Sequence, residues 1–248
     1  MDPIPSEIWI MILEHLASVT KIAQYATVCR KWQAVIEKLN FHSLSLSARD
    51  GLIPDSIMAK RNSLIKYIWY SIELPDYGCS KCSHWDSPRD VRVSSWRIKD
   101  GIDTMFQALS KHQHLHSRGM TLDLSIHSLS DAEHYFKHIR FEPANIDPAN
   151  ALSRTRMKEK VLHHVPEHSM TPPFTAVERI MSVLPFSDFD ASGLKIPETD
   201  ERFWSSVPQV PCVTRLLLRR QTRRRWDPPT ITRLLALFPN LEDLVIEP

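Results

Sequence analysis

The first forty residues of this chain carry an order of apolar positions that limits how they can fold. Pro5 opens a short segment in which Ile8, Ile12 and Leu16 recur at every fourth position, the spacing of one stripe on an α-helix. Proline suits the first turn of a helix, where its missing N–H would have no intrahelical partner. Other apolar residues lie off this stripe. A segment of this size cannot bury so much apolar surface within itself, and we expect a second surface to cover part of it.

A second helix is predicted after a gap, and together the two segments resemble the F-box family. The motif reads Ile4-Pro5-Ser6-Glu7 at its start and Val28-Cys29-Arg30-Lys31-Trp32 further on. The resemblance implies a three-helix module over residues 1–41 that docks onto the Skp-type adaptor, and through it the cullin, of an SCF ubiquitin ligase. The adaptor-binding residues that it implies are Ile4, Pro5, Ile8, Ile12, Leu16, Val28 and Trp32.

Two positions depart from the family pattern. Ile4 stands where the family usually has leucine, and residues 17–21 lack the aspartate or proline common in the turn between the helices. The alternative interpretation is an ordinary helical hairpin packed into the core of the rest of the chain.

Beyond residue 40, short runs of alternating apolar residues predict β-strands with one buried face. Helix-like stretches separate these runs, and strand alternating with helix resembles the leucine-rich-repeat family. The runs are Phe41-x-x-Leu44-x-Leu46, Ile65-x-x-Ile68-x-Tyr70, Gly119-x-x-Leu122-x-Leu124, Val213-x-x-Leu216-x-Leu218 and Leu241-x-x-Leu244-x-Ile246.

The spacing of these runs is irregular, because two proline-containing segments interrupt them. We expect loop or disordered insertions near 141–173 and 186–211. The predicted fold class is mixed α/β, with the helical module followed over 42–248 by an irregular leucine-rich-repeat-like α/β solenoid. This combination resembles the F-box proteins of filamentous fungi. Helices are predicted at 55–62, 102–116, 176–184 and 230–237, and a capping box at Ser130–Glu133 predicts another toward Ile139.

Composition and charge exclude several classes of protein. The net charge of +2 gives the chain no strong field toward nucleic acid or anionic lipid. No apolar run is long enough to span a membrane, and the N-terminus does not resemble a signal peptide. Four cysteines do not make a disulfide scaffold. We therefore expect a cytoplasmic or nuclear protein with no membrane partner.

Two clusters have the residue types of a metal site. Cys79-Ser80-Lys81-Cys82 has the spacing of half a zinc site, but no second pair follows, so reduced loop thiols are the expected state. His112, His114 and His116 lie near the end of a predicted helix, where histidines also suit the helix dipole. We expect no bound metal and no cofactor.

No pattern of an enzyme is visible in the sequence. Five glycines provide no phosphate-binding loop, and no nucleophile elbow or paired zinc-binding histidines occur. The chain is therefore expected to be non-catalytic. On the F-box resemblance, it would hold a target protein for ubiquitin transfer, with the chemistry supplied elsewhere.

An arginine-rich stretch near the C-terminus indicates a further partner. Arginine matches carboxylate and phosphate groups bidentately, so an exposed patch could bind an acidic or phosphorylated protein. The alternative function is a free-standing interaction protein that uses this patch on nucleic acid or acidic partners, although nucleic acid is not the expected partner. It is also open that the arginine stretch is simply a solvated loop, neutralised by Asp200, Glu201 or other acids. The predicted partner-binding residues are Arg219, Arg220, Arg223, Arg224 and Arg225.

Overall fold

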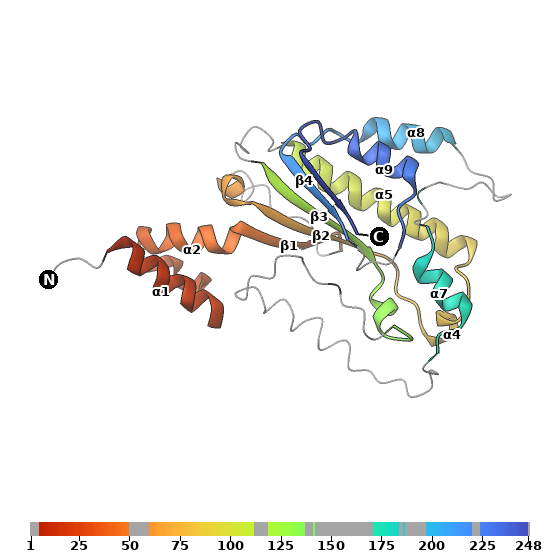
Figure 1. The fold of residues 1–248 in the computed structure, drawn as a ribbon, viewed down its shortest axis with the longest axis horizontal. Coiled ribbons are helices and arrows are strands. Elements are labelled where there is room, and N and C mark those ends of the chain that lie inside the picture. The colour runs from red at the N-terminus through yellow and green to blue at the C-terminus, as the bar shows by residue number, and fades with distance from the viewer. Residues whose placement is uncertain are drawn as a thin grey trace.

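The fold is taken from a computed structural model of the chain. The structure describes residues 5–49, 60–111, 119–136, 141, 171–183, 186, 197–219 and 224–247. Figure 1 shows two N-terminal helices that project from one edge of a β-sheet, with the remaining helices gathered around the sheet. The predicted mixed α/β class is confirmed.

The N-terminal module consists of three helical segments, of which the middle one is a 3₁₀ turn. Pro5 is the N-cap of the first helix, and its carbonyl oxygen accepts hydrogen bonds from the amides of Ile8 and Trp9. The last helix passes into the first strand with no residue between them. The segments are α1 (Ser6–Val19), η1 (Ala23–Thr27) and α2 (Arg30–His42).

Five strands form one sheet in which every neighbouring pair is parallel. Their order in the sheet is their order in the chain, so each new strand is added on the same side as the one before. In doubly wound folds the strand order reverses at a switch point where ligands bind, and these five strands show no reversal. The strands are β1 (Ser43–Ser47), β2 (Tyr67–Glu73), β3 (Met120–His127), β4 (Val213–Leu218) and β5 (Asp243–Ile246).

The five segments predicted as strands are these five strands, and their motif positions align across the sheet. Leu44 pairs with Ile68, and the same register continues through β3, β4 and β5. The aligned rows are Leu44, Ile68, Leu122, Leu216 and Leu244, and Leu46, Tyr70, Leu124, Leu218 and Ile246. The expectation of a single buried face is wrong for β2 and β3, which are buried on both faces as central parallel strands usually are.

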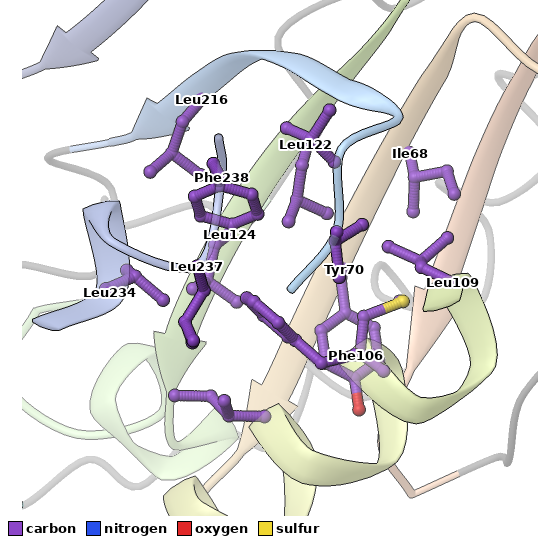
Figure 2. Packing of buried hydrophobic residues seen from close by; sticks show 14 of the residues in the cluster. Ile68, Tyr70, Phe106, Leu109, Leu122, Leu124, Leu216, Leu234, Leu237 and Phe238 are labelled. Atoms are coloured by element: carbon purple, nitrogen blue, oxygen red, sulfur yellow. The ribbon is translucent and has the colours of Figure 1, made fainter. Parts of the chain in front are cut away.

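Three helices cover the face to which these rows point (Figure 1). The longest is α5 (Pro88–Lys111), accompanied by α8 (Pro197–Ser206) and α9 (Pro228–Leu235). Figure 2 shows Phe106 of α5 between Tyr70 of the sheet and Phe238 beyond α9. The rings of Phe106 and Phe238 are 5.2 Å apart between centroids. The residues of α5 that face this core are Ile98, Ile102, Met105, Phe106 and Leu109.

Two glycines permit close approaches around the sheet. A Cβ atom at Gly101 would lie 2.9 Å from the Ile72 side chain, so glycine lets α5 rest directly on β2. The Tyr70 hydroxyl donates to the Gly101 carbonyl oxygen at 2.9 Å, which satisfies a buried polar group at the same contact. Gly119, just before β3, has a φ of 64°, which a residue with a side chain rarely adopts.

The second face of the sheet is also covered. Tyr67, Trp69 and Leu217 pack there against α7 (Phe174–Met181) and against residues that follow β3. A repeat solenoid is therefore not established by this structure, which shows a five-stranded parallel sheet with cover on both faces. The remaining short helices of the described ranges are η2 (Asn62–Leu64), α4 (Cys79–Cys82) and η4 (Leu129–Ala132).

Several predicted helix positions need correction. Helix α5 begins at Pro88, well before the predicted 102, and residues 197–206 of the predicted 186–211 insertion are helix α8. The aromatic pair Phe203 and Trp204 supplies the apolar contact that holds α8 against the core. The capping box after β3 joins Ser128 to Asp131, two residues earlier than predicted. The helix that it opens is a single 3₁₀ turn.

Other expectations fall on residues outside the described ranges. These are most of the predicted helix at 55–62, the end of the predicted helix after Lys111, and much of the two predicted insertions.

Candidate functional site

The N-terminal module has a small apolar core of its own. Leu13 of α1 and Ile36 of α2 are fully buried, and Ala17 and Ile22 complete the cluster. Leu16, Trp32, Val35 and Leu39 pack around it and are partly buried. The three helical segments therefore bury only one side of α1.

The opposite side of α1 is an exposed apolar stripe, here called the α1 stripe, made of Ile8, Met11, Ile12 and Val19. Successive residues of a helix are about 100° apart, so these four positions fall on one face. All four are exposed, with Met11 63% and Val19 69% accessible to solvent. Leu13, one residue beyond Ile12, is fully buried, so the boundary between core and stripe is sharp.

The predicted adaptor-binding residues divide into two groups. Pro5, Ile8, Ile12 and Val28 are exposed, and Ile8 and Ile12 belong to the α1 stripe. Leu16 and Trp32 instead pack against the module core, and the Trp32 ring lies 5.6 Å from the ring of Trp9 between centroids. Ile4 lies outside the described residues. No described contact tests adaptor binding itself, which stays a prediction.

The stripe predicted from the sequence, Ile8, Ile12 and Leu16, included neither Met11 nor Val19. The helical period contains the signal for both, because Met11 and Val19 lie three and eleven residues after Ile8 and return to the same face.

The comparison with protein families concerns this part of the chain. The F-box-like family matches residues 1–47, which include α1, η1, α2 and β1. Residues 1–47 are an F-box-like domain. Comparison of the whole chain with curated proteins and with solved structures returns no match.

The F-box-like domain is of a class that binds a Skp-type adaptor and typically carries no catalytic residues. No helix in the described part of the chain is long and apolar enough to cross a membrane.

Two arginines of the stretch, Arg219 and Arg224, are not exposed as the sequence analysis expected. Arg219 is largely buried, and its Nη1 donates to the Asp123 carboxylate at 3.2 Å. Asp123 is fully buried in β3 and also accepts a hydrogen bond from the Tyr67 hydroxyl. A buried carboxylate requires a nearby cation, which explains why Arg219 turns inward.

Arg224 is buried as well. Its Nη2 lies 3.5 Å from Oδ1 of Asp131, which is 1% exposed. Arg225 is exposed at its side chain, and its Nε donates to the Met181 carbonyl oxygen. Arg220 and Arg223 lie outside the described residues. The prediction of one exposed patch is therefore wrong at Arg219 and Arg224.

In the described part of the chain, Asp200 and Glu201 pair with basic residues outside the arginine stretch. Asp200 accepts a hydrogen bond from the Lys99 ammonium at 2.8 Å, and Glu201 pairs with Arg233. Arg215, which precedes the buried Leu216 in β4, is half-exposed and pairs with Asp243 of the neighbouring strand at 2.8 Å.

A buried histidine lies beside this charged region. His127, the last residue of β3, is fully buried, and its ring stacks on Phe141 at 3.8 Å between centroids. Burial, together with the positive charge of Arg224, lowers its pKa to about 3. The imidazole is therefore neutral at physiological pH.

The Cys79–Cys82 motif forms the one-turn helix α4 and is not a loop as predicted. Cys79 is exposed and Cys82 is buried. Burial, reinforced by the neighbouring Cys79, raises the pKa of the Cys82 thiol. Within the described ranges, no three histidine, cysteine or acidic side chains come together as a metal site, while His112, His114 and His116 lie outside those ranges.

Proposed function

We propose that the chain is a substrate-recognition subunit of an SCF-type ubiquitin ligase. The observation that carries this proposal is the α1 stripe on an F-box-like domain. Exposed isoleucine, methionine and valine side chains on one helix face favour association with an apolar partner surface. The partner proposed for this face is a Skp-type adaptor, and through it a cullin.

The energetic argument for adaptor docking comes from the size of the exposed side chains. Complete burial of one such side chain contributes about 1.5–3 kcal/mol. The four residues of the α1 stripe are partly exposed in the free chain, so a partner that covers them gains several of these contributions. Association then requires no charged contact.

The sheet region, defined here as the described residues from β1 onward, is the part proposed to bind the target protein. Its support is the sequential order of five parallel strands and the alignment of their apolar positions, an arrangement resembling an irregular leucine-rich repeat. The covered second face distinguishes it from an open horseshoe, so the target surface stays unassigned.

The proposed chain contributes no catalytic group of its own. Its role would be proximity, because holding a target beside the ligase raises the effective concentration of the target. The resemblance to fungal F-box proteins and the expected location in cytoplasm or nucleus remain predictions.

The alternative function, binding of nucleic acid or acidic partners through arginines, has less support than the sequence alone gave it. Arg219 and Arg224 are engaged with Asp123 and Asp131, so their charges are compensated inside the protein. A strong phosphate-binding surface needs uncompensated cations.

Titration of the full chain with purified Skp-type adaptor at low and at high salt tests the proposal. We expect association at micromolar concentration or tighter, and an affinity that changes little with salt because the contact is apolar. Absence of association at micromolar concentration contradicts the proposed function. A steep loss of affinity with salt contradicts the apolar mode of docking.

A further inference from the structure

The first cysteine of α4 lies against a histidine that is distant in the sequence. The Sγ atom of Cys79 is 3.5 Å from Nδ1 of His134, within hydrogen-bonding distance for sulfur. Cys79 is exposed, whereas His134 is almost fully buried. The sulfur is therefore accessible to a small molecule while the imidazole behind it is shielded.

The second ring nitrogen of His134 fixes which nitrogen faces the thiol. Nε2 lies 3.2 Å from the carbonyl oxygen of Tyr77. A carbonyl oxygen only accepts hydrogen bonds, so Nε2 carries the hydrogen and donates it. Nδ1 is then the ring nitrogen that accepts, and the Cys79 thiol donates to it.

The imidazole is also held in orientation by its neighbours. The Tyr77 ring stacks on it at 5.4 Å between centroids, and the Tyr77 hydroxyl donates to Asp131 at 2.9 Å. The guanidinium of Arg179 lies 4.5 Å from the centre of the same tyrosine ring. A thiol, a base and groups that orient the base are the parts of an activated nucleophile.

Cys82 is placed to react with Cys79 in a second step. Its thiol donates to the Cys79 carbonyl oxygen at 3.0 Å, so its sulfur points back along α4 toward Cys79. In helical geometry, residues three apart have Cα atoms about 5 Å apart. Disulfides form across Cα distances of about 4.4–6.8 Å, so the pair can close with little movement of the backbone.

We propose that Cys79 is a redox-active thiol that attacks small-molecule disulfides, with His134 as its proton acceptor and Cys82 as the second thiol. The Cys79 sulfur forms a bond to one sulfur of the small disulfide, the S–S bond breaks, and the other half leaves as a thiolate. The Cys79 proton goes to Nδ1 of His134. Cys82 then displaces the bound half as a thiol, and the Cys79–Cys82 disulfide remains.

Two electrons pass in the complete reaction from the two protein thiols to the small disulfide, which is reduced to two thiols. The burial that raises the pKa of Cys82 keeps it protonated, so Cys79 is the first to react. This inference is independent of the proposed ligase function.

The first test uses glutathione disulfide as the probe on the full chain carrying Cys82→Ser. Its reference is a peptide of residues 76–85 with the same substitution, which contains Cys79 without the fold. We expect glutathione to add to Cys79 in the chain about tenfold faster than in the peptide, because the imidazole is held in place to accept the thiol proton as the sulfur attacks. Equal rates overturn the proposal.

A second test follows the product in the chain with both α4 cysteines present. We expect loss of two hydrogen atoms by mass spectrometry and a crosslink between Cys79 and Cys82, with no glutathione retained there. The Cys82→Ser chain should instead retain one glutathione on Cys79. A persistent glutathione adduct on Cys79 when Cys82 is present overturns the role of the second thiol.

The third test replaces the base. In the Cys82→Ser chain, His134→Asn should slow the reaction of Cys79 to the rate of the peptide, while His84→Asn, at an exposed histidine two residues beyond Cys82, should leave it unchanged. Continued protection of the buried Cys212 shows that each variant is folded. An unchanged rate in folded His134→Asn overturns the role of His134. If that variant unfolds, the comparison with the peptide decides.

Discussion

The F-box-like domain and the sheet region place their side chains in opposite ways. The domain leaves apolar residues such as Ile12 and Met11 in water, whereas the sheet region takes Asp123, Asp131 and Arg224 out of water. Each arrangement is costly in isolation, because exposed apolar surface and buried charge are both unfavourable. The domain offers its exposed surface to a partner, and the sheet region compensates its charges internally.

This difference shows why charge in the sequence is a poor guide to the binding surface here. The arginine stretch is the most conspicuous charged feature of the sequence, but Arg219 and Arg224 serve the interior. The apolar face of α1 is less conspicuous, since apolar residues are normally expected inside. Among the described residues, the α1 stripe offers exposed apolar surface to a partner, whereas Arg219 and Arg224 are already paired inside the protein.

The largest effect is expected from removing a buried charge of the sheet region. Asp123→Ala removes the fully buried carboxylate that pairs with Arg219, while the half-exposed Glu247 remains 4.0 Å from Arg219, and it should lower the free energy of unfolding by about 3–5 kcal/mol. Asp243→Ala is the matched control, since Asp243 pairs with Arg215 of β4 at a half-exposed site, and it should cost at most about 1 kcal/mol. Urea unfolding of both variants measures the difference. Similar costs would show that the charges in the sheet region are not effectively buried.

A smaller effect is expected within the F-box-like domain, where adjacent residues have opposite roles. Leu13→Ala should destabilise the domain by about 2–5 kcal/mol, because it opens a cavity in a small core. Ile12→Ala should change its stability by no more than about 0.5 kcal/mol, because Ile12 already contacts water. Hydrogen exchange of the α1 amides reports both values. Equal destabilisation by the two substitutions would show that Ile12 belongs to the core and would contradict the α1 stripe as an exposed surface.

The third prediction concerns the pH dependence of the sheet region. The pKa of His127 is lowered to about 3 in the folded protein, from 6.5 in the unfolded chain. Between these values the unfolded chain binds the extra proton, so the folded state loses stability as pH falls from about 6.5 toward 3. In this range, each unit by which the pH falls lowers the free energy of unfolding by up to about 1.4 kcal/mol through this histidine. Well above pH 6.5 the histidine has no such effect.

Replacement His127→Phe keeps the ring beside Phe141 and removes the titrating group. The variant should show a shallower loss of stability on acidification than the unmodified chain, as measured by urea unfolding at several pH values. His84→Phe changes an exposed histidine and should retain the original dependence. Parallel pH curves for the His127 variant and the unmodified chain would contradict the neutral buried state.

Much of the fold could be predicted because its signals are local in the sequence. Apolar alternation located all five strands, and the spacing of Pro5, Ile8 and Ile12 indicated the F-box-like domain. The missed features depend on distant partners. Arg219 turns inward because of Asp123, which lies 96 residues earlier, and α8 forms where Phe203 and Trp204 meet a core built by other elements. No local pattern contains these contacts.

The same difference between local signals and distant contacts separates the α1 stripe from the cluster around α4. The α1 stripe is readable from the helical period once Leu13 is known to face inward. The contact between Cys79 and His134 joins residues 55 positions apart and required the fold. Sequence reasoning therefore found the apolar surface in outline and could not find the cluster around α4.

The affinity of purified Skp-type adaptor for two isoleucine variants of the full chain tests the central claim most directly. Ile12 and Ile10 are 40% and 39% exposed on the same helix, but two helical positions separate them by about 200°, so only Ile12 belongs to the α1 stripe. We predict that Ile12→Ala weakens binding about tenfold or more and that Ile10→Ala changes it less than about twofold. Equal effects of the two substitutions, or no effect of Ile12→Ala, would contradict docking through the α1 stripe.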